Sequence, residues 1–196
     1  MGELRKTDER ERERTHAGNT GDAGAGFRAI IAEQEDAEEI MQLLQRTAEW
    51  FRGRGSTQWQ GLLYGEDSHR TVEAIARGDV YVYRKGDAAD IAGIVMLLRE
   101  PSSWDRSLWG EEGHEGTIYL HRLAVERAYA GEGLGERIMR WVESEVRFPG
   151  KNRIRLDCLA GNPVLNDFYR RLGYRYAGLG EIANGSYSKY EKHLVP

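Results

Sequence analysis

Cysteine is nearly absent from this sequence, which limits how the fold can be stabilised. Cys158 is the single cysteine among 196 residues, so no internal disulfide can form and a reducing, cytoplasmic setting fits the chain best. No cluster of Cys and His has the spacing of zinc ligands. We therefore expect no metal site.

Long apolar runs and an excess of positive charge are also missing. No segment approaches the ~18 to 20 apolar residues that cross a bilayer, and the N-terminus has no apolar signal-peptide core. The net charge of -4 and pI near 5.8 give no electrostatic reason to expect nucleic acid or an anionic membrane as a partner. We therefore predict a soluble protein that binds neither nucleic acid nor a membrane. The formation of a homodimer is left open.

The chain divides into a tail and a domain. Residues 1–26 are charged at first and then rich in Gly and Ala, with almost nothing to bury, so a disordered N-terminal tail is expected. Residues 27–196 should form one domain, because the chain is 40% hydrophobic and long enough to bury a core.

Hydrophobic patterning within the domain predicts alternating strands and helices. The predicted strands are 27–32, 80–84, 91–99, 117–125, 153–159, 174–181 and 187–194. The predicted helices are 36–51, 68–76, a segment from near Gly133 to before Pro149, and 163–173. Residues 100–116 are predicted to be a polar surface loop at the end of the sheet far from residues 130–135. This order favours α/β layers around a mixed sheet.

Three alternating glycines stand between a predicted strand and a predicted helix. Gly131, Gly133 and Gly135 follow a strand that ends at Val125, so backbone N–H groups near a helix N-terminus are available to a phosphate. A P-loop is excluded, because Glu136 follows where Lys is needed, and the match to a dinucleotide fingerprint is weak. A tight turn without a ligand remains the alternative.

Two segments together resemble the GNAT superfamily of acetyl-CoA-dependent N-acyltransferases. The first is "LAV" ahead of "AGEGLG" (130–135), which is similar to the family's phosphate loop Q/R-x-x-G-x-G, and the second is "NPVLNDFYRRLGY" (162–174). Ala130 stands where Gln or Arg is usual, which removes a side chain that could help to order the loop. The resemblance implies a GNAT-like α/β (α+β) fold over residues 27–196, with a mixed, mostly antiparallel sheet of six to seven strands and about four helices.

The resemblance also implies a binding site for acetyl-CoA or coenzyme A. Backbone groups of one strand would lie along the pantetheine arm, namely those of Leu123, Ala124 and Val125. Backbone amides of the glycine run would hold the pyrophosphate, namely those of Ala130, Gly131, Glu132, Gly133, Leu134 and Gly135. Asn162 would bond to the pantetheine or lie near the acetyl group, and it can also be the N-cap of its helix.

Amine attack on a thioester requires a neutral amine and a stabilised leaving thiolate. Tyr169 resembles the family's acid, although it can instead pack within its helix's apolar stripe. His121 is a candidate base, expected on the same strand face as Leu123, with a packed structural histidine as the alternative. Asp157 is a second candidate base, with an ion pair to Arg155 or Arg122 as its alternative. Deprotonation through water also stays open, and we expect Cys158 to be a buried, inert thiol.

The acceptor site is expected, from the resemblance, between the first two helices and at the last hairpin. The candidate residues are Trp50, Gln58, Trp59 and Tyr64, with the hairpin near Asn184 to Tyr187. The predicted activity is transfer of acetyl from acetyl-CoA to a primary amine of a small molecule or peptide, by direct attack in a ternary complex. The alternative is an acyl-CoA-binding sensor without turnover.

Overall fold

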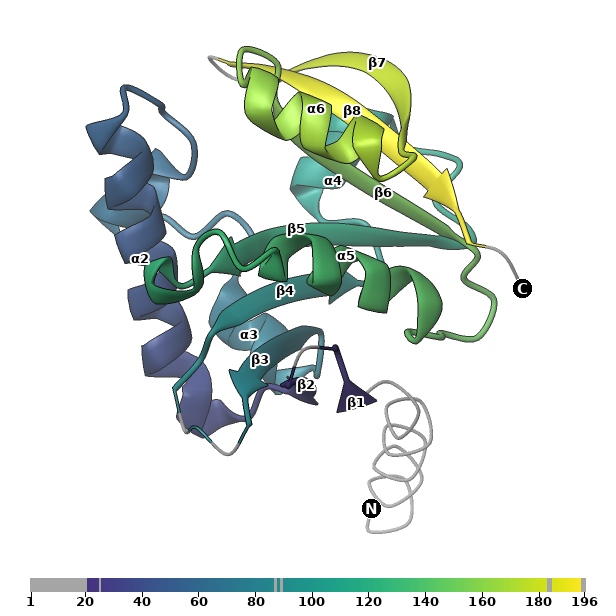
Figure 1. Ribbon diagram of the computed structural model, residues 1–196. Coiled ribbons are helices and arrows are strands. Elements are labelled where there is room, and N and C mark those ends of the chain that lie inside the picture. Colours follow the sequence, from purple (N-terminus) through teal and green to yellow (C-terminus); the bar gives the residue numbers. More distant parts are fainter. Residues whose placement is uncertain (1–20, 25, 87, 89, 183–184, 195–196) are drawn as a thin grey trace, which may run out of the picture.

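One twisted sheet of eight strands organises the protein. The computed structural model describes residues 21–24, 26–86, 88, 90–182 and 185–194, and the strand order is β1-β2-β3-β4-β5-β6-β8-β7 (Figure 1). The strands are β1 (Gly21–Asp22), β2 (Phe27–Ile31), β3 (Val80–Lys85), β4 (Gly93–Leu98), β5 (Thr117–Val125), β6 (Arg153–Leu159), β7 (Arg175–Ile182) and β8 (Gly185–His193). All neighbours are antiparallel except β5 and β6, which are parallel. The mixed, mostly antiparallel sheet that was predicted is confirmed.

The sheet has one strand more than the predicted six to seven, and the additional strand is β1. Gly21 and Asp22 pair with β2, and Ala23 is buried in the core, although residues 1–26 were predicted to be a disordered tail. The folded part of the chain therefore begins before Phe27. A two-residue strand has too few side chains to give a hydrophobic pattern. Residues 1–20 and 25 lie outside the described residues.

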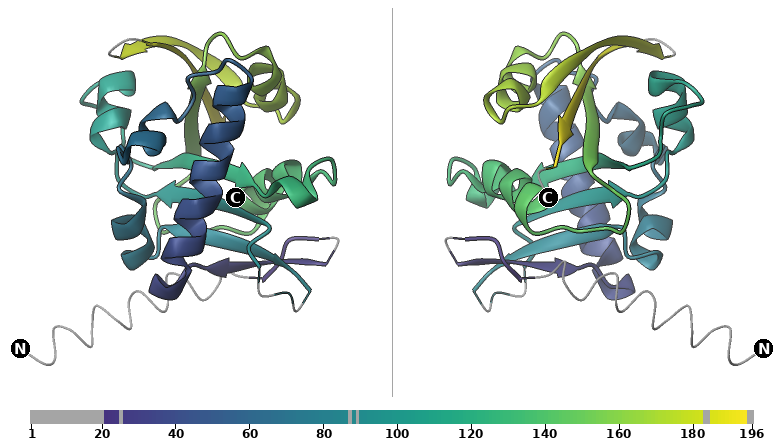
Figure 2. Two further views of the ribbon diagram at one scale, coloured as in Figure 1. Left: turned by 90° about the vertical axis from the view of Figure 1, so that its left-hand side faces the viewer. Right: turned by 90° about the vertical axis from the view of Figure 1, so that its right-hand side faces the viewer.

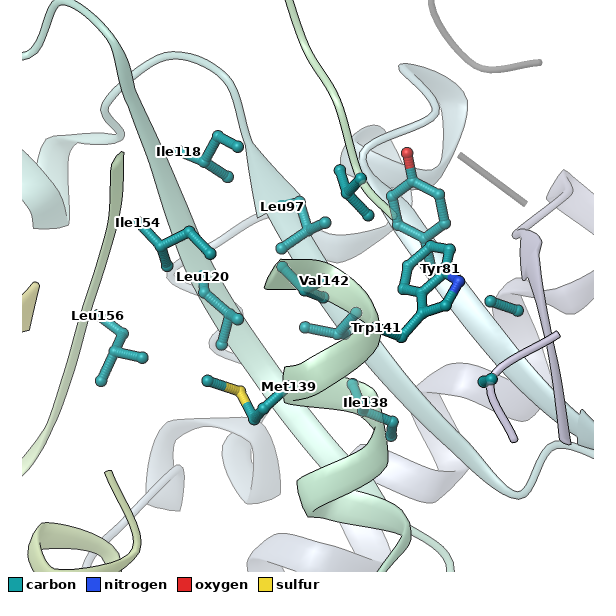
Figure 3. Close-up of a cluster of buried hydrophobic side chains, with 14 of the residues drawn as sticks. Tyr81, Leu97, Ile118, Leu120, Ile138, Met139, Trp141, Val142, Ile154 and Leu156 are labelled. Carbon is teal, nitrogen blue, oxygen red and sulfur yellow. The ribbon is translucent and has the colours of Figure 1, made fainter. Parts of the chain in front are cut away.

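Two helices cover one face of the sheet. Helix α5 (Leu134–Ser144) and helix α6 (Pro163–Arg171) bury their apolar sides there. Figure 3 shows Ile138, Met139, Trp141 and Val142 of α5 facing side chains from β3 to β6. The Trp141 ring lies 5.4 Å from the Tyr81 ring and 5.6 Å from the Tyr83 ring, and such tilted and edge contacts between large side chains fix the position of α5.

The remaining helices pack on the opposite face. Helix α2 (Ala37–Gly53) buries Ile40, Leu43, Leu44 and Ala48, and the short helix α3 (Thr71–Ala76) buries Ala74 and Ile75 in the same cluster. Figure 2 shows α3 and α4 on one side of the sheet, and α5 and α6 on the other. Short 3-10 turns connect these elements: η1 (Gln34–Asp36), η2 (Gln60–Tyr64) and η3 (Arg127–Tyr129).

The predicted polar loop 100–116 contains a helix, so that prediction was wrong. Helix α4 (Ser103–Trp109) begins with a capping box, in which Ser102 Oγ accepts from the Asp105 N–H and the Asp105 carboxylate accepts from the Ser102 N–H. Asp105 and Leu108 are buried. The helix folds back over the sheet instead of staying at its far end, and it brings side chains to the middle of β5.

Candidate active site

The site lies where β5 and β6 stop being neighbours. Their parallel ladder ends at the pair Tyr119 and Arg155. Beyond that pair, β5 continues beside β4 while β6 continues beside β8, and the two strands diverge (Figure 1). Backbone groups on the β6-facing edge of β5 can therefore bind a ligand in the way that they would bind an added strand.

A cavity of about 280 Å³, the site cavity, opens at this divergence. Side chains from both diverging strands meet there with side chains from three helices, from β8 and from the connection between α2 and α3. The lining residues are Phe51, residues 57–62, Glu66, Ser68, His69, Trp104, residues 120–123 and 157–159, Leu165, Tyr169 and Tyr187.

A bulge in β5 changes which residues face the cavity. Ile94 pairs with Ala124 and Met96 pairs with His121, so β5 has one residue more than β4 over this stretch. Arg122 lies within this bulge, and its φ of 52° is in the left-handed region. Leu123 consequently packs against the cluster under α5, and His121 lies on the other face. The prediction that His121 and Leu123 share a face was therefore wrong.

His121 is buried and held by a carboxylate. Its Nε2 lies 3.0 Å from Oδ1 of Asp105 in α4. Burial alone lowers the pKa of His121, but Asp105 and, to a smaller extent, Asp157 outweigh that effect, so the pKa lies above its ordinary value. Burial raises the pKa of Asp105, yet its bonds to His121 and Ser102 bring it below the ordinary value. Asp105 therefore stays ionised and fixes the orientation of the imidazole.

A second imidazole stacks on the first. The rings of His69 and His121 are 4.0 Å apart and inclined by 27°. Burial, followed by the charges of His121 and Arg122, holds the pKa of His69 well below its ordinary value. Of this pair, only His121 is therefore able to carry a proton near neutral pH.

Asp157 lies on β6, next to α4. Its Oδ1 accepts a hydrogen bond of 3.1 Å from Trp104 Nε1, and the Trp104 ring meets the Tyr187 ring edge-on at 4.9 Å. Burial raises the pKa of Asp157 to about 6, although His121 and the Trp104 N–H oppose the rise. The predicted alternative of an ion pair with Arg155 or Arg122 was wrong, because those residues pair with Glu191 and Asp67.

Tyr169 projects from α6 into the same cavity, beside Cys158 of β6. Burial, with contributions from Cys158 and Asp157, raises the pKa of Tyr169 far above its ordinary value, so the phenol keeps its proton. Burial and the charge of Asp157 raise the pKa of Cys158 to about 12. The thiol is buried and stays protonated, as was expected of an inert cysteine.

Two of the three alternating glycines are required by the backbone. Gly131 has a φ of 87° and Gly133 has a φ of 73°, which non-glycine residues rarely adopt. Gly133 is also the N-cap of α5, so the helix begins where the sequence predicted. Gly135 is helical, and a Cβ there would meet only Val125 and Phe168 at 3.9 and 4.0 Å. The fold itself has no need of a glycine at position 135.

The glycine run presents its backbone to solvent. Residues 130–133 are exposed, and the first turn of a helix leaves its N–H groups without intrahelical partners. The Ala130 and Glu132 amides, however, donate to carbonyls of η3, so two of the six predicted amide donors are engaged within the turn. The Glu132 carboxylate pairs with Lys85 at 2.7 Å, which offsets its charge beside the loop.

Asn162 and the aromatic residues predicted at the acceptor site have different positions. Asn162 is the N-cap of α6, since its side chain accepts from the Leu165 N–H at 3.1 Å. Trp59 lines the site cavity, whereas the side chain of Tyr64 is 68% exposed and does not. Tyr187 lines the cavity and Trp50 does not; Asn184 lies outside the described residues.

The pattern of the acetyltransferase (GNAT) family matches residues 38–174 of the sequence. The chain belongs to the GNAT family. It is 53% identical over 170 residues to the uncharacterised N-acetyltransferase YesJ of Bacillus subtilis, with 87% of this chain and 92% of YesJ covered. As a member of the family, it is an acetyl-CoA-dependent acetyltransferase.

Solved GNAT structures share the architecture. A GNAT acetyltransferase from Listeria monocytogenes is 33% identical, with a TM-score of 0.71 and coverage of 90% of this chain and 100% of that one. The PaiA N-acetyltransferase from Thermoplasma acidophilum, solved with coenzyme A, has 18% identity, a TM-score of 0.62 and coverage of 85% and 98%. The fold class is therefore confirmed by both likenesses.

Sequence reasoning missed two residues of this GNAT site, both on α4. Asp105 holds His121, and Trp104 donates to Asp157. The signal for the helix was present, because Ser102 followed three residues later by Asp105 is a cap pattern. Nothing in the sequence indicated that α4 would lie against β5 and β6.

Among the helices of the described part of the chain, none has the length and apolar character needed to span a bilayer.

Proposed function

We propose that this GNAT protein transfers the acetyl group of acetyl-CoA to a primary amine, by direct attack within a ternary complex. One observation carries the proposal. The gap between β5 and β6 brings His121 with its carboxylate, the protonated phenol of Tyr169 and the unpaired edge of β5 into one cavity.

The residues at the divergence fit the cofactor. The β6-facing edge of β5 would bind the pantetheine arm at Leu123 and Val125, and the exposed amides at the start of α5 would bind the diphosphate. The Asn162 side chain lies beside the site cavity, because its Nδ2 donates a hydrogen bond of 3.4 Å to Oε1 of Gln58, a residue of the cavity wall. Acetyl-CoA supplies a thioester, whose carbonyl carbon accepts the amine nitrogen.

His121 is the residue that we assign as general base. A lysine-like amine with a pKa of ~10.4 is neutral in about one molecule in 2,500 at pH 7, which costs ~4.6 kcal/mol. The Nε2–H of His121 faces Asp105, so the neutral ring has its lone pair on Nδ1 and can accept the amine proton there. A positioned base typically contributes ~10² to 10⁴ in rate.

Tyr169 acts on the leaving sulfur. Full proton transfer from an ordinary phenol to a thiolate is uphill by ~2 kcal/mol, and the raised pKa of Tyr169 makes it steeper. The phenol therefore donates a hydrogen bond to the sulfur as the carbon–sulfur bond breaks, and the thiolate later takes a proton from solvent or from His121. Direct attack also fits Cys158, whose protonated thiol is a poor nucleophile.

The test is acetyl transfer to a panel of primary amines, followed by mass spectrometry of both products and protein. We expect an acetylated amine, one equivalent of free thiol, and no acetyl group on the protein after incubation with acetyl-CoA alone. Acetyl-CoA at 100 times its Kd should stabilise the fold by ~2.7 kcal/mol. Stabilisation without any acetylated amine would favour the sensor instead, and an acetyl group on Cys158 would exclude direct attack.

A further inference from the structure

Most of the charges around the site cavity are already neutralised by a partner. His121 pairs with Asp105 at 3.0 Å, and Arg122 pairs with Asp67 at 2.7 Å. Glu66, a third charged lining residue, is exposed at the rim, where water screens it. What remains inside the cavity is the carboxylate of Asp157.

Asp157 forms no ion pair among the described residues of the chain, and its one hydrogen bond comes from the Trp104 indole. The positive charge of His121 acts on Asp157, but that charge is absent whenever His121 is neutral and able to act as the base. A half-buried carboxylate with a single donor is poorly solvated, and a cation beside it would recover that lost free energy. The same poor solvation of the carboxylate raises the pKa of Asp157.

The position of Asp157 relates it to the base. Trp104 and Asp105 are consecutive residues of α4; the first reaches Asp157 and the second reaches His121. A cation held at Asp157 is therefore close to the imidazole that must accept its proton. This arrangement suits the ammonium form of the acceptor, which arrives charged and is then deprotonated.

The surrounding walls are aromatic. Trp104 and Tyr187 meet at 4.9 Å beside Asp157, and Phe51 and Trp59 meet at 5.6 Å elsewhere in the lining. The Arg122 guanidinium already lies 5.3 Å from the Trp59 ring centroid. A second ammonium group along that wall would meet this guanidinium, so the space beyond Asp157 favours an uncharged, apolar body.

We propose that the acceptor is a compact amine with one ammonium group, which binds beside Asp157, and an apolar or aromatic body without a carboxylate next to the nitrogen. A carboxylate there would face Asp157. A polyamine would bring further ammonium groups toward the Arg122 guanidinium beside Trp59. This proposal rests on the acetyl transfer proposed above, and it narrows the acceptor of the same site.

The experiment compares phenethylamine, phenylalanine and spermidine as acceptors at saturating acetyl-CoA. For the wild type, kcat/KM for phenethylamine should exceed both others at least tenfold. Asp157→Asn should lower it about 10- to 100-fold, mainly through KM, because a hydrogen bond to a charged group is lost. Asp90→Asn, at an exposed carboxylate outside the lining of the site cavity, is the matched control and should change it less than threefold. Acetyl-CoA affinity, measured by calorimetry, should be equal in all three proteins.

The neutral isostere phenethyl alcohol supplies a measurement that needs no variant. It should inhibit the wild type with an inhibition constant at least tenfold above the Michaelis constant for phenethylamine. Phenylalanine or spermidine as the better acceptor would overturn the proposal, and so would unchanged kinetics in Asp157→Asn. If phenylalanine were the better acceptor, Arg122, whose Nε is a buried donor without a partner among the described residues, would become the candidate for binding its carboxylate. Binding of acetyl-CoA without acetylation of any amine would refute the proposed function itself.

Discussion

The proposed cofactor region and the proposed acceptor region differ in the kind of group that they present. The proposed cofactor region, the cofactor end, is exposed backbone at the glycine run, outside the lining of the site cavity, and along the edge of β5. The proposed acceptor region, the acceptor end, is built from ionisable side chains, above all the buried His121 and Asp105 and the half-buried Asp157. Backbone donors survive most substitutions, whereas a buried charge depends on each neighbour. Substitutions at the acceptor end should therefore change acetyl transfer, through kcat or through KM for the amine, and substitutions at the cofactor end should change affinity for acetyl-CoA.

Removing the base should have the largest effect. His121→Gln keeps a polar group but cannot accept the amine proton, so we expect kcat to fall ~10² to 10⁴-fold. Acetyl-CoA affinity should be unchanged in calorimetry. His193→Gln, at the exposed end of β8, is the matched control and should retain full activity. A loss of affinity equal to the loss of kcat would erase the distinction between the two ends.

Removing the phenol oxygen should have the next largest effect. Tyr169→Phe deletes the hydrogen bond to the leaving sulfur while keeping the ring contacts with Phe168 and Tyr190. We expect kcat to fall about 10- to 100-fold, as for a lost hydrogen bond to a charged group, with little change in acetyl-CoA binding. Steady-state kinetics are the measurement, and Tyr176→Phe, at a tyrosine that is 43% exposed, is the control. Unchanged turnover would leave Tyr169 with a packing role only.

The third change addresses the cofactor end. Gly135→Ala places a methyl group at the start of α5, where the protein offers only ordinary contacts. We expect an unchanged or slightly higher Tm, since Ala favours helix over Gly by ~1 kcal/mol, together with a Kd for acetyl-CoA raised about tenfold. Gly53→Ala in α2, where nothing lies within 4 Å of the new Cβ, should show the same Tm behaviour and no change in Kd. Wild-type affinity in Gly135→Ala would place the diphosphate elsewhere.

The smallest expected effect concerns stability. The pKa of Asp157 rises from 3.8 to about 6 on folding, so the folded state binds the proton more tightly, and stability falls as the pH rises through this range. Asp157→Asn removes that loss, and should raise the unfolding free energy at pH 8 by ~1 to 3 kcal/mol. At pH 3.5 the carboxyl is protonated in the folded state and mostly protonated in the unfolded state, so the difference should fall to ~0.3 kcal/mol or less. Thermal unfolding at both pH values checks this, and a destabilised variant at pH 8 would contradict it.

The helix starts at the proposed cofactor end could be predicted because their determinants are local. Asn162 and Pro163 start α6, Gly133 starts α5, and each signal acts within a few residues of the sequence. The acceptor end depends instead on contacts between elements far apart in the chain, such as Trp104 with Asp157. No local pattern records which short helix will cover which strand.

The bulge in β5 shows a second limit. It depends on a left-handed backbone at Arg122, and arginine gives no signal for that conformation, unlike glycine. Trp59 and Arg70 adopt the same region, and Trp59 lines the cavity. Strict alternation along the sequence therefore assigned His121 and Leu123 to one face. Tertiary packing, which stabilises these strained residues, overrides the local preference.

The Asp105 carboxylate makes two different interactions, one with each of its oxygens. Asp105 Oδ2 accepts from Ser102 and closes the first turn of α4, while Oδ1 holds the imidazole of His121. A helix of seven residues has little stability of its own, and when it frays, the histidine loses its carboxylate and Asp157 loses its indole. On heating, catalysis should therefore stop at a temperature at which the sheet is still intact and coenzyme is still bound.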